Sequence, residues 1–444
     1  MIRFALRGVR RRWTSYLAAG AVLFAGTALL TAFALLLETG LAPGAAGNDT
    51  LVMLPAILGG WTVLIVVFGV VSTIALTVQQ RERELALLRS IAATVGQVRR
   101  VVVAEVLAVA VPAIALGILP GVGLGAFVLS RLRAAGTAPD GLGPQVGSIT
   151  LLGGAALAVV SALVAAIVAS RRAGAVPPIR ALAAASVSRG PALSRVRRTA
   201  GLVSTALGAA LSITTFFMPN DAMLSSTAGP AGVAVAIGLA LLSPALIPGL
   251  GRVAGRLIGA PVRQAGRNLT VEPGRAAVVV APLVLLIGIA GGTLYLQATE
   301  DSVQTGPRTP GDVASLSSVN YLIVAMIVAF CAILVLNTLI AATRRRRREF
   351  GLLRLTAATR SQVIGIVLAE TLLTGGLATV LGTIAAVSTT APYSMVRTGS
   401  LIPAGSIWIY VGVVAGGFAL AFLATLPTTV RSLWTPPVEA IAAV

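Results

Sequence analysis

The chain has 444 residues, of which 57% are hydrophobic and 11% are charged, whereas an ordinary soluble domain has about 25% charged residues. Apolar runs of about 20 residues recur along it, and a helix of that length can cross a bilayer. The net charge is +20, but the arginines lie beside the ends of the apolar runs, where they set the orientation of membrane helices. This composition excludes a soluble enzyme as the leading interpretation. We expect a lipid bilayer, and no nucleic acid, as a partner.

Two residue types that carry chemistry in many proteins are missing. Lysine does not occur in the sequence, so a phosphate-binding loop of the form GxxxxGK[ST] cannot form. Histidine does not occur either, and the single cysteine, Cys331, lies within an apolar run. These facts exclude a clustered His/Cys metal site and a disulfide within the chain. We therefore predict that the chain is not an enzyme, that it has no catalytic or metal-binding residues, and that it holds no cofactor of its own.

The apolar runs predict an all-α polytopic membrane protein with about ten transmembrane helices. The basic N-terminus and the apolar run after it resemble a signal peptide, but the run from Trp13 to Leu37 is longer than the apolar region of such a peptide. We therefore interpret it as a first span that is retained. In chain order, the predicted spans cover residues 13–37, 53–78, 101–130, 148–170, 199–217, 230–250, 276–297, 319–342, 362–388 and 406–428.

Arginine-rich loops alternate with loops that hold half of the acidic residues and few arginines. Because arginine-rich loops stay in the cytoplasm, an even number of spans places both termini there, in a multi-pass protein of the plasma (inner) membrane. The densest run of positive charge, Arg344–Arg348, is expected to fix the orientation and to touch anionic lipid headgroups. Contact of this run with an acidic surface of a partner protein is the alternative.

An internal repeat is the most informative feature of the sequence. Glu84–Glu105 and Glu349–Glu370 align without a gap, and 12 of their 22 positions are identical. A second match joins the segments that begin with the proline pairs at 177–178 and 436–437. The repeat predicts two related four-helix cores with a two-helix insert between them. The predicted divisions are 1–185 for the first core, 186–259 for the insert and 260–444 for the second core.

Each copy of the repeat begins with a short amphipathic helix that ends near an alanine pair. A threonine follows, with a glutamine three residues later, which is the pattern of a capping box that starts the next helix. A short helix of this kind can rest on lipid, pack on its own spans or insert into a groove of a partner. The residues expected to carry its function are Glu84, Leu87, Leu88, Arg89 and Ile91 in the first copy and Glu349, Leu352, Leu353, Arg354 and Thr356 in the second. The predicted helix caps are Thr94 with Gln97 and Thr359 with Gln362.

The repeat ends at Glu105 and Glu370, about a turn or two inside the next predicted span. An ionisable side chain within a membrane span often has a functional role, for example in proton coupling. Near the cytoplasmic interface, however, an arginine can pair with the carboxylate, and Arg89, Arg99 and Arg100 are the candidates beside Glu105. We favour ion pairs that orient each short helix against its span.

The repeated string E-x-x-LLR-x-x-A-A-T-x-x-Q-V, the glutamate after it and the closing PP-hydrophobic-x-A-hydrophobic segment resemble the FtsX/MacB-like permease family of ABC transporters, which has the type VII ABC fold. The resemblance is to the ten-span form of this family, which is related to bacitracin-resistance permeases. The gap at 298–318 is too short for the large extracellular domain of those members. The resemblance implies that the two short helices are coupling helices, which dock on two copies of an ATP-binding subunit that holds ATP and Mg²⁺.

The expected function is that of a permease subunit that couples ATP hydrolysis by a separate subunit to the export or extrusion of an amphipathic substrate, such as a peptide, a lipid or an antibiotic. Two alternatives stay open. One is a transporter driven by an ion gradient, which needs carboxylates near the middle of the membrane, where the sequence offers few apart from Glu105 and Glu370. The other is a membrane regulator or sensor that transports nothing.

Overall fold

A computed structural model of the chain describes its long helices and most of the segments between them. All of the regular secondary structure in the described residues is helical. The described residues are 13–45, 49–79, 81, 84–85, 87, 90, 94–139, 141–175, 194–221, 223–257, 259–303, 310–344, 346–355 and 358–434.

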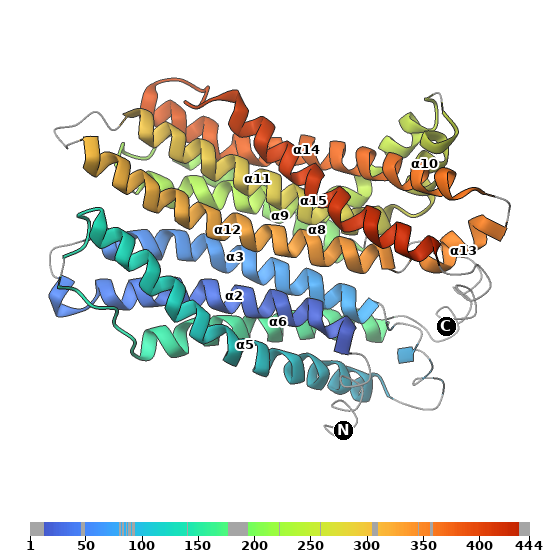
Figure 1. Ribbon diagram of the computed structural model, residues 1–444, viewed down its shortest axis with the longest axis horizontal. Helices are drawn as coiled ribbons and strands as arrows, with labels where there is room; N and C mark the ends of the chain where they lie inside the picture. Colours follow the sequence, from blue (N-terminus) through green and yellow to red (C-terminus); the bar gives the residue numbers. More distant parts are fainter. Residues whose placement is uncertain are drawn as a thin grey trace. The chain divides into compact units, whose positions relative to one another are not determined.

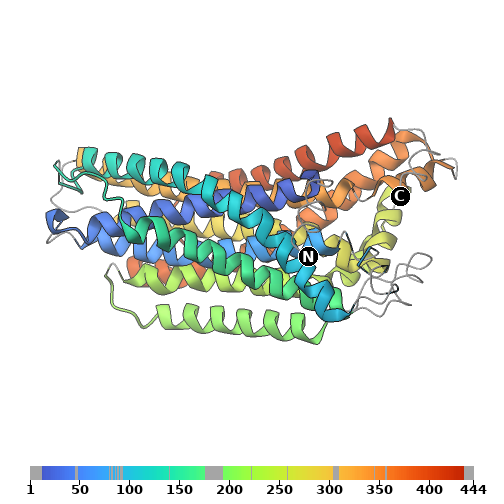
Figure 2. The same cartoon turned by 90° about the horizontal axis from the view of Figure 1, so that it is seen from below.

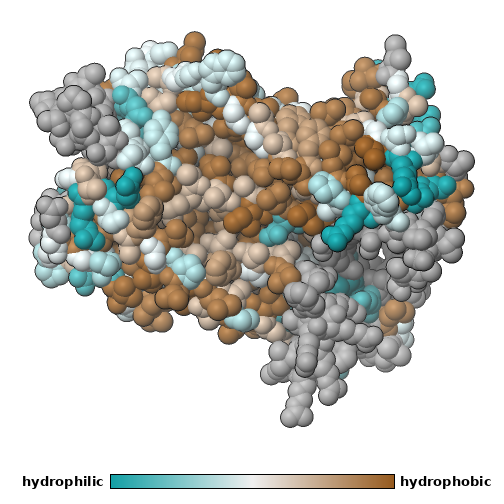
Figure 3. Space-filling view, viewed as in Figure 1, coloured by the Kyte–Doolittle hydropathy of each residue, from teal (hydrophilic) through white to brown (hydrophobic). Residues whose placement is uncertain are grey.

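Nine helices within these ranges are long and apolar enough to cross a membrane. They are α2 (Trp13–Gly40), α3 (Thr50–Gln79), α5 (Val95–Ala134), α6 (Gly154–Ala175), α9 (Leu224–Ala254), α11 (Pro273–Val303), α12 (Pro310–Arg344), α14 (Arg360–Thr398) and α15 (Ile407–Leu433), and Figure 1 labels them. At 1.5 Å per residue, the 40 residues of α5 and the 39 residues of α14 exceed the hydrocarbon core of about 30 Å. Hydrophilic residues gather toward the helix ends (Figure 3). The chain is an all-α polytopic membrane protein, as predicted.

The other elements are short or less apolar. They are the 3₁₀ turn η1 (Pro43–Ala45), the π-helix η2 (Ile149–Gly153), α8 (Arg195–Thr215), α10 (Ala260–Val271) and α13 (Arg347–Leu355). α8 corresponds to the fifth predicted span, 199–217, but it is not among the nine helices above. Three arginines near its N-terminus make it less apolar than those helices.

α8 packs antiparallel to α9 along most of its length. Toward one end of the contact, Gly201 lies against Leu242, and at the other end Thr215 Oγ1 and Thr227 Oγ1 are hydrogen-bonded at 2.9 Å. Between these points the two backbones touch, because a Cβ on Gly208 would lie 2.7 Å from a backbone oxygen of α9. Small residues at such crossings allow membrane helices to pack closely. α8 therefore follows α9 over most of the depth of that helix.

The helices form two compact units. Unit 1 comprises Met1–Val187 with Asp301–Ile333, and unit 2 comprises Ser188–Glu300 with Leu334–Val444. The predicted insert at 186–259 belongs to unit 2 for nearly all of its length, because α8 and α9 both pack against α14. The division into two cores and an insert that we drew from the repeat stays a prediction. It rests on sequence similarity between the two repeats, whereas the two units are defined by contacts between helices.

The first span of each predicted core is deeply buried. In unit 1 this span is α2, which contacts α3, α5 and α6 and buries Val22 and Leu35 completely. α5 approaches α2 so closely that a Cβ on Gly121 would lie 2.6 Å from the Cβ of Thr31. In unit 2 the span is α11, where Val284 is likewise fully buried. These two helices hold the polar groups described next in fixed positions.

Candidate functional site

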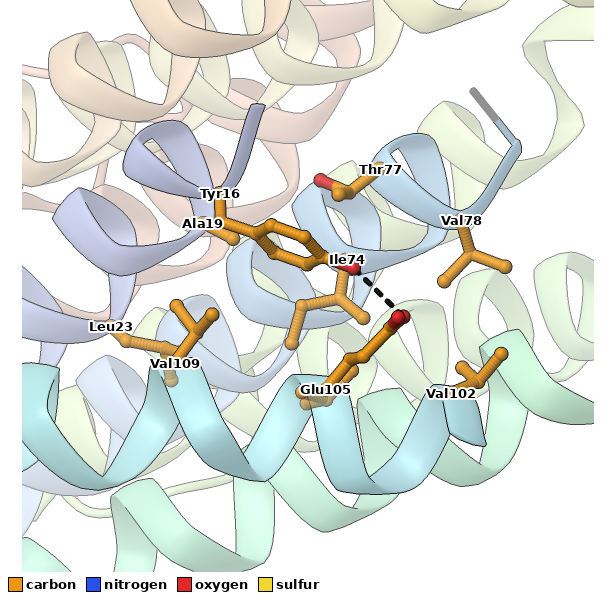
Figure 4. Close-up of a pocket in the computed structure, with 10 residues that line it drawn as sticks. Tyr16, Ala19, Leu23, Ile74, Thr77, Val78, Val102, Glu105 and Val109 are labelled. Carbon is orange, nitrogen blue, oxygen red and sulfur yellow. Dashed lines mark hydrogen bonds between the residues drawn. The ribbon is translucent and has the colours of Figure 1, made fainter. Parts of the chain in front are cut away.

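In unit 1 the repeat joins three helices through a cluster of charges. Arg81 follows α3, and its guanidinium pairs with the carboxylate of Glu105 on α5. The same guanidinium donates to Tyr16 Oη on α2 at 2.8 Å and to Glu84 Oε2 at 3.3 Å. Tyr16 Oη donates to Glu105 Oε2 at 2.9 Å, as Figure 4 shows. Because Glu105 is only 2% exposed, a buried ion pair and a phenol tie α2, α3 and α5 together.

Unit 2 has a similar cluster at the repeated positions. Arg346 pairs with Glu370 on α14 and with Glu349 on α13, where Nη2 and Oε1 are 3.1 Å apart. Asn268 Nδ2 on α10 donates to Glu370 Oε1 at 2.5 Å. Arg275 Nη1 on α11 donates to Glu349 Oε2 at 2.8 Å. An amide thus replaces the tyrosine hydroxyl of unit 1, and α10, α11, α13 and α14 meet in one polar cluster.

The partner of Glu105 differs from the candidates that the sequence suggested. Arg99 and Arg100 are exposed, and Arg89 lies outside the described residues. Positions five or six residues before a helical residue point to another side of the helix, because only residues three or four apart share a face. The arginine that pairs with Glu105 is Arg81, which reaches it from the end of another helix.

A signal in the sequence could have identified this partner. The repeat alignment extends upstream, and an arginine stands three residues before the first glutamate in each copy, at Arg81 and Arg346. Burial alone would lower the pKa of both guanidiniums, but the neighbouring carboxylates, together with Tyr16 in the case of Arg81, raise it above the usual value. Burial alone would raise the pKa of Glu349, yet Arg346 and Arg275 hold it below its usual value. These three groups are therefore charged at neutral pH.

One side of α13 is fixed to unit 2. Phe350 is 1% exposed and packs with Val363 and Val367 of α14 and with Leu433 of α15. One helical turn later, Arg354 Nη1 donates to the backbone oxygen of Leu433 at 2.9 Å. α13 is therefore fixed to two membrane spans by an apolar contact and a hydrogen bond.

The other side of α13 is exposed and apolar, since Leu352 and Leu355 are 50% and 56% exposed. The first copy of the repeat has the same pattern. Leu85, which aligns with Phe350, is 1% exposed, and Leu87, which aligns with Leu352, is 46% exposed. Both copies therefore have one inward and one outward apolar position.

The predicted residues of the short helices do not share one environment. Glu84 and Glu349 face arginines, whereas Leu353 packs partly buried against the Phe350 cluster. Sequence reasoning missed the inward Leu85 and Phe350, because apolar spacing alone does not tell which side of a helix meets its own protein. The predicted residues that lie outside the described residues are Leu88, Arg89, Ile91 and Thr356.

Both predicted capping boxes are present. Thr94 Oγ1 accepts from Gln97 N at 3.2 Å, and Gln97 Oε1 accepts from Thr94 N at 2.9 Å. Thr359 and Gln362 make the same two bonds at 3.3 and 2.9 Å. These caps start α5 and α14, and α14 begins a few residues after α13 ends.

A small cavity lies beside each charge cluster. Glu105 lines the first and Glu370 the second, and the cavities enclose about 10 and about 50 Å³. Tyr16, the fourth residue of α2, projects into the first cavity (Figure 4). Ala276, the fourth residue of α11, lines the second cavity at the corresponding position. Since a water molecule needs about 10–15 Å³ of such space, the second cavity has room for several waters and the first for at most one.

The chain matches the FtsX-like permease C-terminal family over residues 56–178 and again over residues 321–437. No curated protein matches it. The two matched segments together cover more than half of the chain, and each contains one copy of the repeat and the arginine before it. The chain therefore belongs to the FtsX-like permease family, whose members are membrane-spanning transport subunits.

Proposed function

We propose that the chain is the permease subunit of an ABC transporter and that its two short helices dock on a separate ATP-binding subunit. The observation that supports this most is the repeated pair of apolar positions, with Leu85 and Phe350 inward and Leu87 and Leu352 outward. An outward leucine adds little to the fold, and its apolar surface leaves water when a partner or lipid covers it. Insertion of an amphipathic helix into a groove is a recurring way of covering such a face.

The charge clusters connect a docked helix to the membrane spans. In unit 2, Glu349 on α13 and Glu370 on α14 share Arg346. Phe350 fixes the same short helix to α14 and α15. A force applied to α13 therefore acts on several spans at once, which is what coupling of ATP hydrolysis to a movement in the membrane requires.

Two copies of one ATP-binding subunit can bind only if both short helices face the same side of the membrane. The membrane spans α5, α6, α9, α11 and α12 lie between them in the chain. If α8 also crosses the membrane, together with α9, the number of crossings between the two short helices is even. The antiparallel packing of α8 on α9 supports that crossing. With the arginine-rich loops, it supports cytoplasmic termini in a plasma (inner) membrane protein.

ATP and Mg²⁺ belong to the partner in this proposal, because the chain has no lysine with which to build a phosphate-binding loop. We infer export or extrusion of an amphipathic peptide, lipid or antibiotic from the family to which the chain belongs. The two halves would respond to closure of the ATP-binding subunits by changing the space between their helices.

Co-purification with the ATP-binding subunit encoded beside this chain tests the proposal. We expect the double variant Leu87→Asp with Leu352→Asp to lose the complex, because truncation or charge at a central contact costs at least about 2 kcal/mol, or roughly 30-fold in affinity, at each helix. ATP turnover should then fall to that of the ATP-binding subunit alone. Leu401→Asp, which changes a leucine 57% exposed in the segment after α14, is the matched control and should leave assembly and turnover unchanged.

Unchanged assembly and turnover in the double variant would refute the docking role. A loss of assembly in Leu401→Asp as well would show that charge at any exposed leucine damages the protein, and the docking assignment would then lose its support.

A transporter driven by an ion gradient is the competing function. Such a protein needs a carboxylate that is free to exchange an ion within the membrane, whereas Glu105 and Glu370 both pair with an arginine. Substrate movement in vesicles that persists after a protonophore and stops with a non-hydrolysable ATP analogue would exclude it. A regulator or sensor would bind the ATP-binding subunit and move no substrate in the same vesicles.

A further inference from the structure

α10 and the adjoining end of α9 form an exposed surface that mixes positive charge with apolar side chains. Figures 1 and 2 show α10 turned away from the direction of the long helices. The exposed arginines are Arg252, Arg256, Arg263 and Arg267. The exposed apolar residues among them are Val253, Leu257 and Val271, each at least 50% exposed. We call these residues the α10 surface.

The opposite face of α10 is held against unit 2. Ala265 is fully buried and Leu269 is 3% exposed. A Cβ on Gly251 of α9 would lie 2.6 Å from the carbonyl oxygen of Gly266, so the two backbones are in contact at this crossing. Because α10 is attached by this face, its arginines are held outward.

Three arginines of the α10 surface lack a carboxylate partner among the described residues. Within the described part of the chain, no carboxylate lies within ion-pair distance of Arg256, Arg263 or Arg267. Glu272, the first residue after α10, pairs instead with Arg275 at 2.8 Å. Since the surface adjoins the membrane spans α9 and α11, the anions that it meets are lipid headgroups. The apolar side chains between the arginines suit the boundary between headgroups and acyl chains, whereas a free phosphate would leave them exposed.

A chain of contacts leads from α10 to the second short helix. Gln264 Nε2 donates to Asn268 Oδ1 at 3.1 Å, and Asn268 Nδ2 donates to Glu370 Oε1 at 2.5 Å. Glu370 and Glu349, which is on α13, both pair with Arg346. The placement of α10 therefore affects the anchoring of α13.

We propose that the α10 surface docks on the headgroups of anionic phospholipids and that this docking steadies α13 through Asn268 and Glu370. Anionic lipid would then set how firmly the second short helix is held. The inference rests on the proposed function only where it treats α13 as the helix that meets the ATP-binding subunit.

Hydrogen exchange of the full-length chain in lipid nanodiscs tests the docking step without any ATP-binding subunit. Discs of phosphatidylcholine alone are compared with discs that contain increasing phosphatidylglycerol, and we expect slower exchange at 260–271 as the anionic fraction rises. Each arginine near an anionic surface contributes roughly fivefold in affinity, so Arg263→Gln with Arg267→Gln should weaken the effect roughly 30-fold and abolish it over the accessible range. Arg99→Gln with Arg100→Gln removes two exposed arginines from α5 and should leave the response at 260–271 unchanged.

Exchange at 260–271 that does not depend on phosphatidylglycerol would overturn the proposal, whatever the co-purification assay shows. Equal protection by inorganic phosphate added to phosphatidylcholine discs would also overturn it, because it would reveal an anion site that needs no lipid.

The variant Asn268→Leu separates docking from its effect on α13. Lipid-dependent protection at 260–271 should persist, and lipid-dependent protection at 347–355 should disappear. Wild-type exchange at 347–355 that is the same in both kinds of disc, or a response that survives Asn268→Leu, would refute the link to α13.

Discussion

Replacement of Arg346 by glutamine should loosen α13 selectively. Among the described residues, Arg346 is the one whose side chain pairs with both Glu349 on α13 and Glu370 on α14. Removal of one member of a buried ion pair costs about 3–5 kcal/mol. Here Glu349 keeps Arg275 and Glu370 keeps Asn268, so we expect a cost at the lower end of that range, about 3 kcal/mol. The side chains of Arg346 and Glu370 are both 12% exposed, so water cannot fully replace the lost contact.

A cost of about 3 kcal/mol corresponds to roughly a hundredfold more frequent opening of α13. Hydrogen exchange at 347–355 of the chain in nanodiscs measures this opening. Arg431→Gln, at an exposed arginine of α15 in the same unit, is the matched control and should change the exchange little. The double variant Arg346→Gln with Glu370→Gln should cost about 2 kcal/mol less than the sum of the single variants, because it removes both charges of the pair. A change of less than threefold in Arg346→Gln, or strict additivity in the double variant, would show that the ion pair does not hold α13.

Three further outcomes are expected from the same cluster. Phe350→Ala should weaken the anchoring of α13 by about 3 kcal/mol, and Leu352→Ala should weaken it by less than about 0.5 kcal/mol. Equal effects of the two variants on exchange at 347–355 would contradict the inward position of Phe350 and the outward position of Leu352. Thr359→Ala should cost about 1 kcal/mol and speed exchange in the first turn of α14, while an unchanged first turn would show that the capping box is dispensable. Burial alone would raise the pKa of Glu349, but two arginines hold it below the usual 4.5. The ionised carboxylate therefore stabilises the anchoring of α13 at neutral pH, and this stabilisation is lost as the pH falls below about 4.5 through the pKa of the folded protein. Acidification should therefore speed exchange at 347–355, and an equal response in Glu349→Gln would refute the assignment.

The features that could be predicted from the sequence depend on residues close together in the chain. The capping boxes at Thr94 and Thr359 need a partner only three residues away, so the pattern alone was sufficient. The membrane spans follow from runs of apolar residues, and the buried Glu105 and Glu370 follow from the aligned repeat. α8 is the intermediate case, because its arginines weaken the hydropathy signal while packing against α9 gives it a place in unit 2.

The features that sequence reasoning missed depend on contacts between helices. The repeat marks Arg81 as a repeated position, but its pairing with Glu105 forms only in the folded bundle, where α3 and α5 both pack on α2. The inward position of Phe350 likewise depends on α14 and α15. The sizes of the two cavities depend on Tyr16 and Ala276, which line them from α2 and α11, helices that the sequence does not place against the repeat.

The unequal cavities show what fusion of two copies into one chain permits. In a symmetric homodimer every residue occurs twice, so a tyrosine that fills one cavity would fill its counterpart too. Here Tyr16 and Ala276 are encoded separately, so the space beside one charge cluster can be filled while the space beside the other stays open. A single substitution can therefore alter the packing beside one charge cluster and leave the other cluster unchanged.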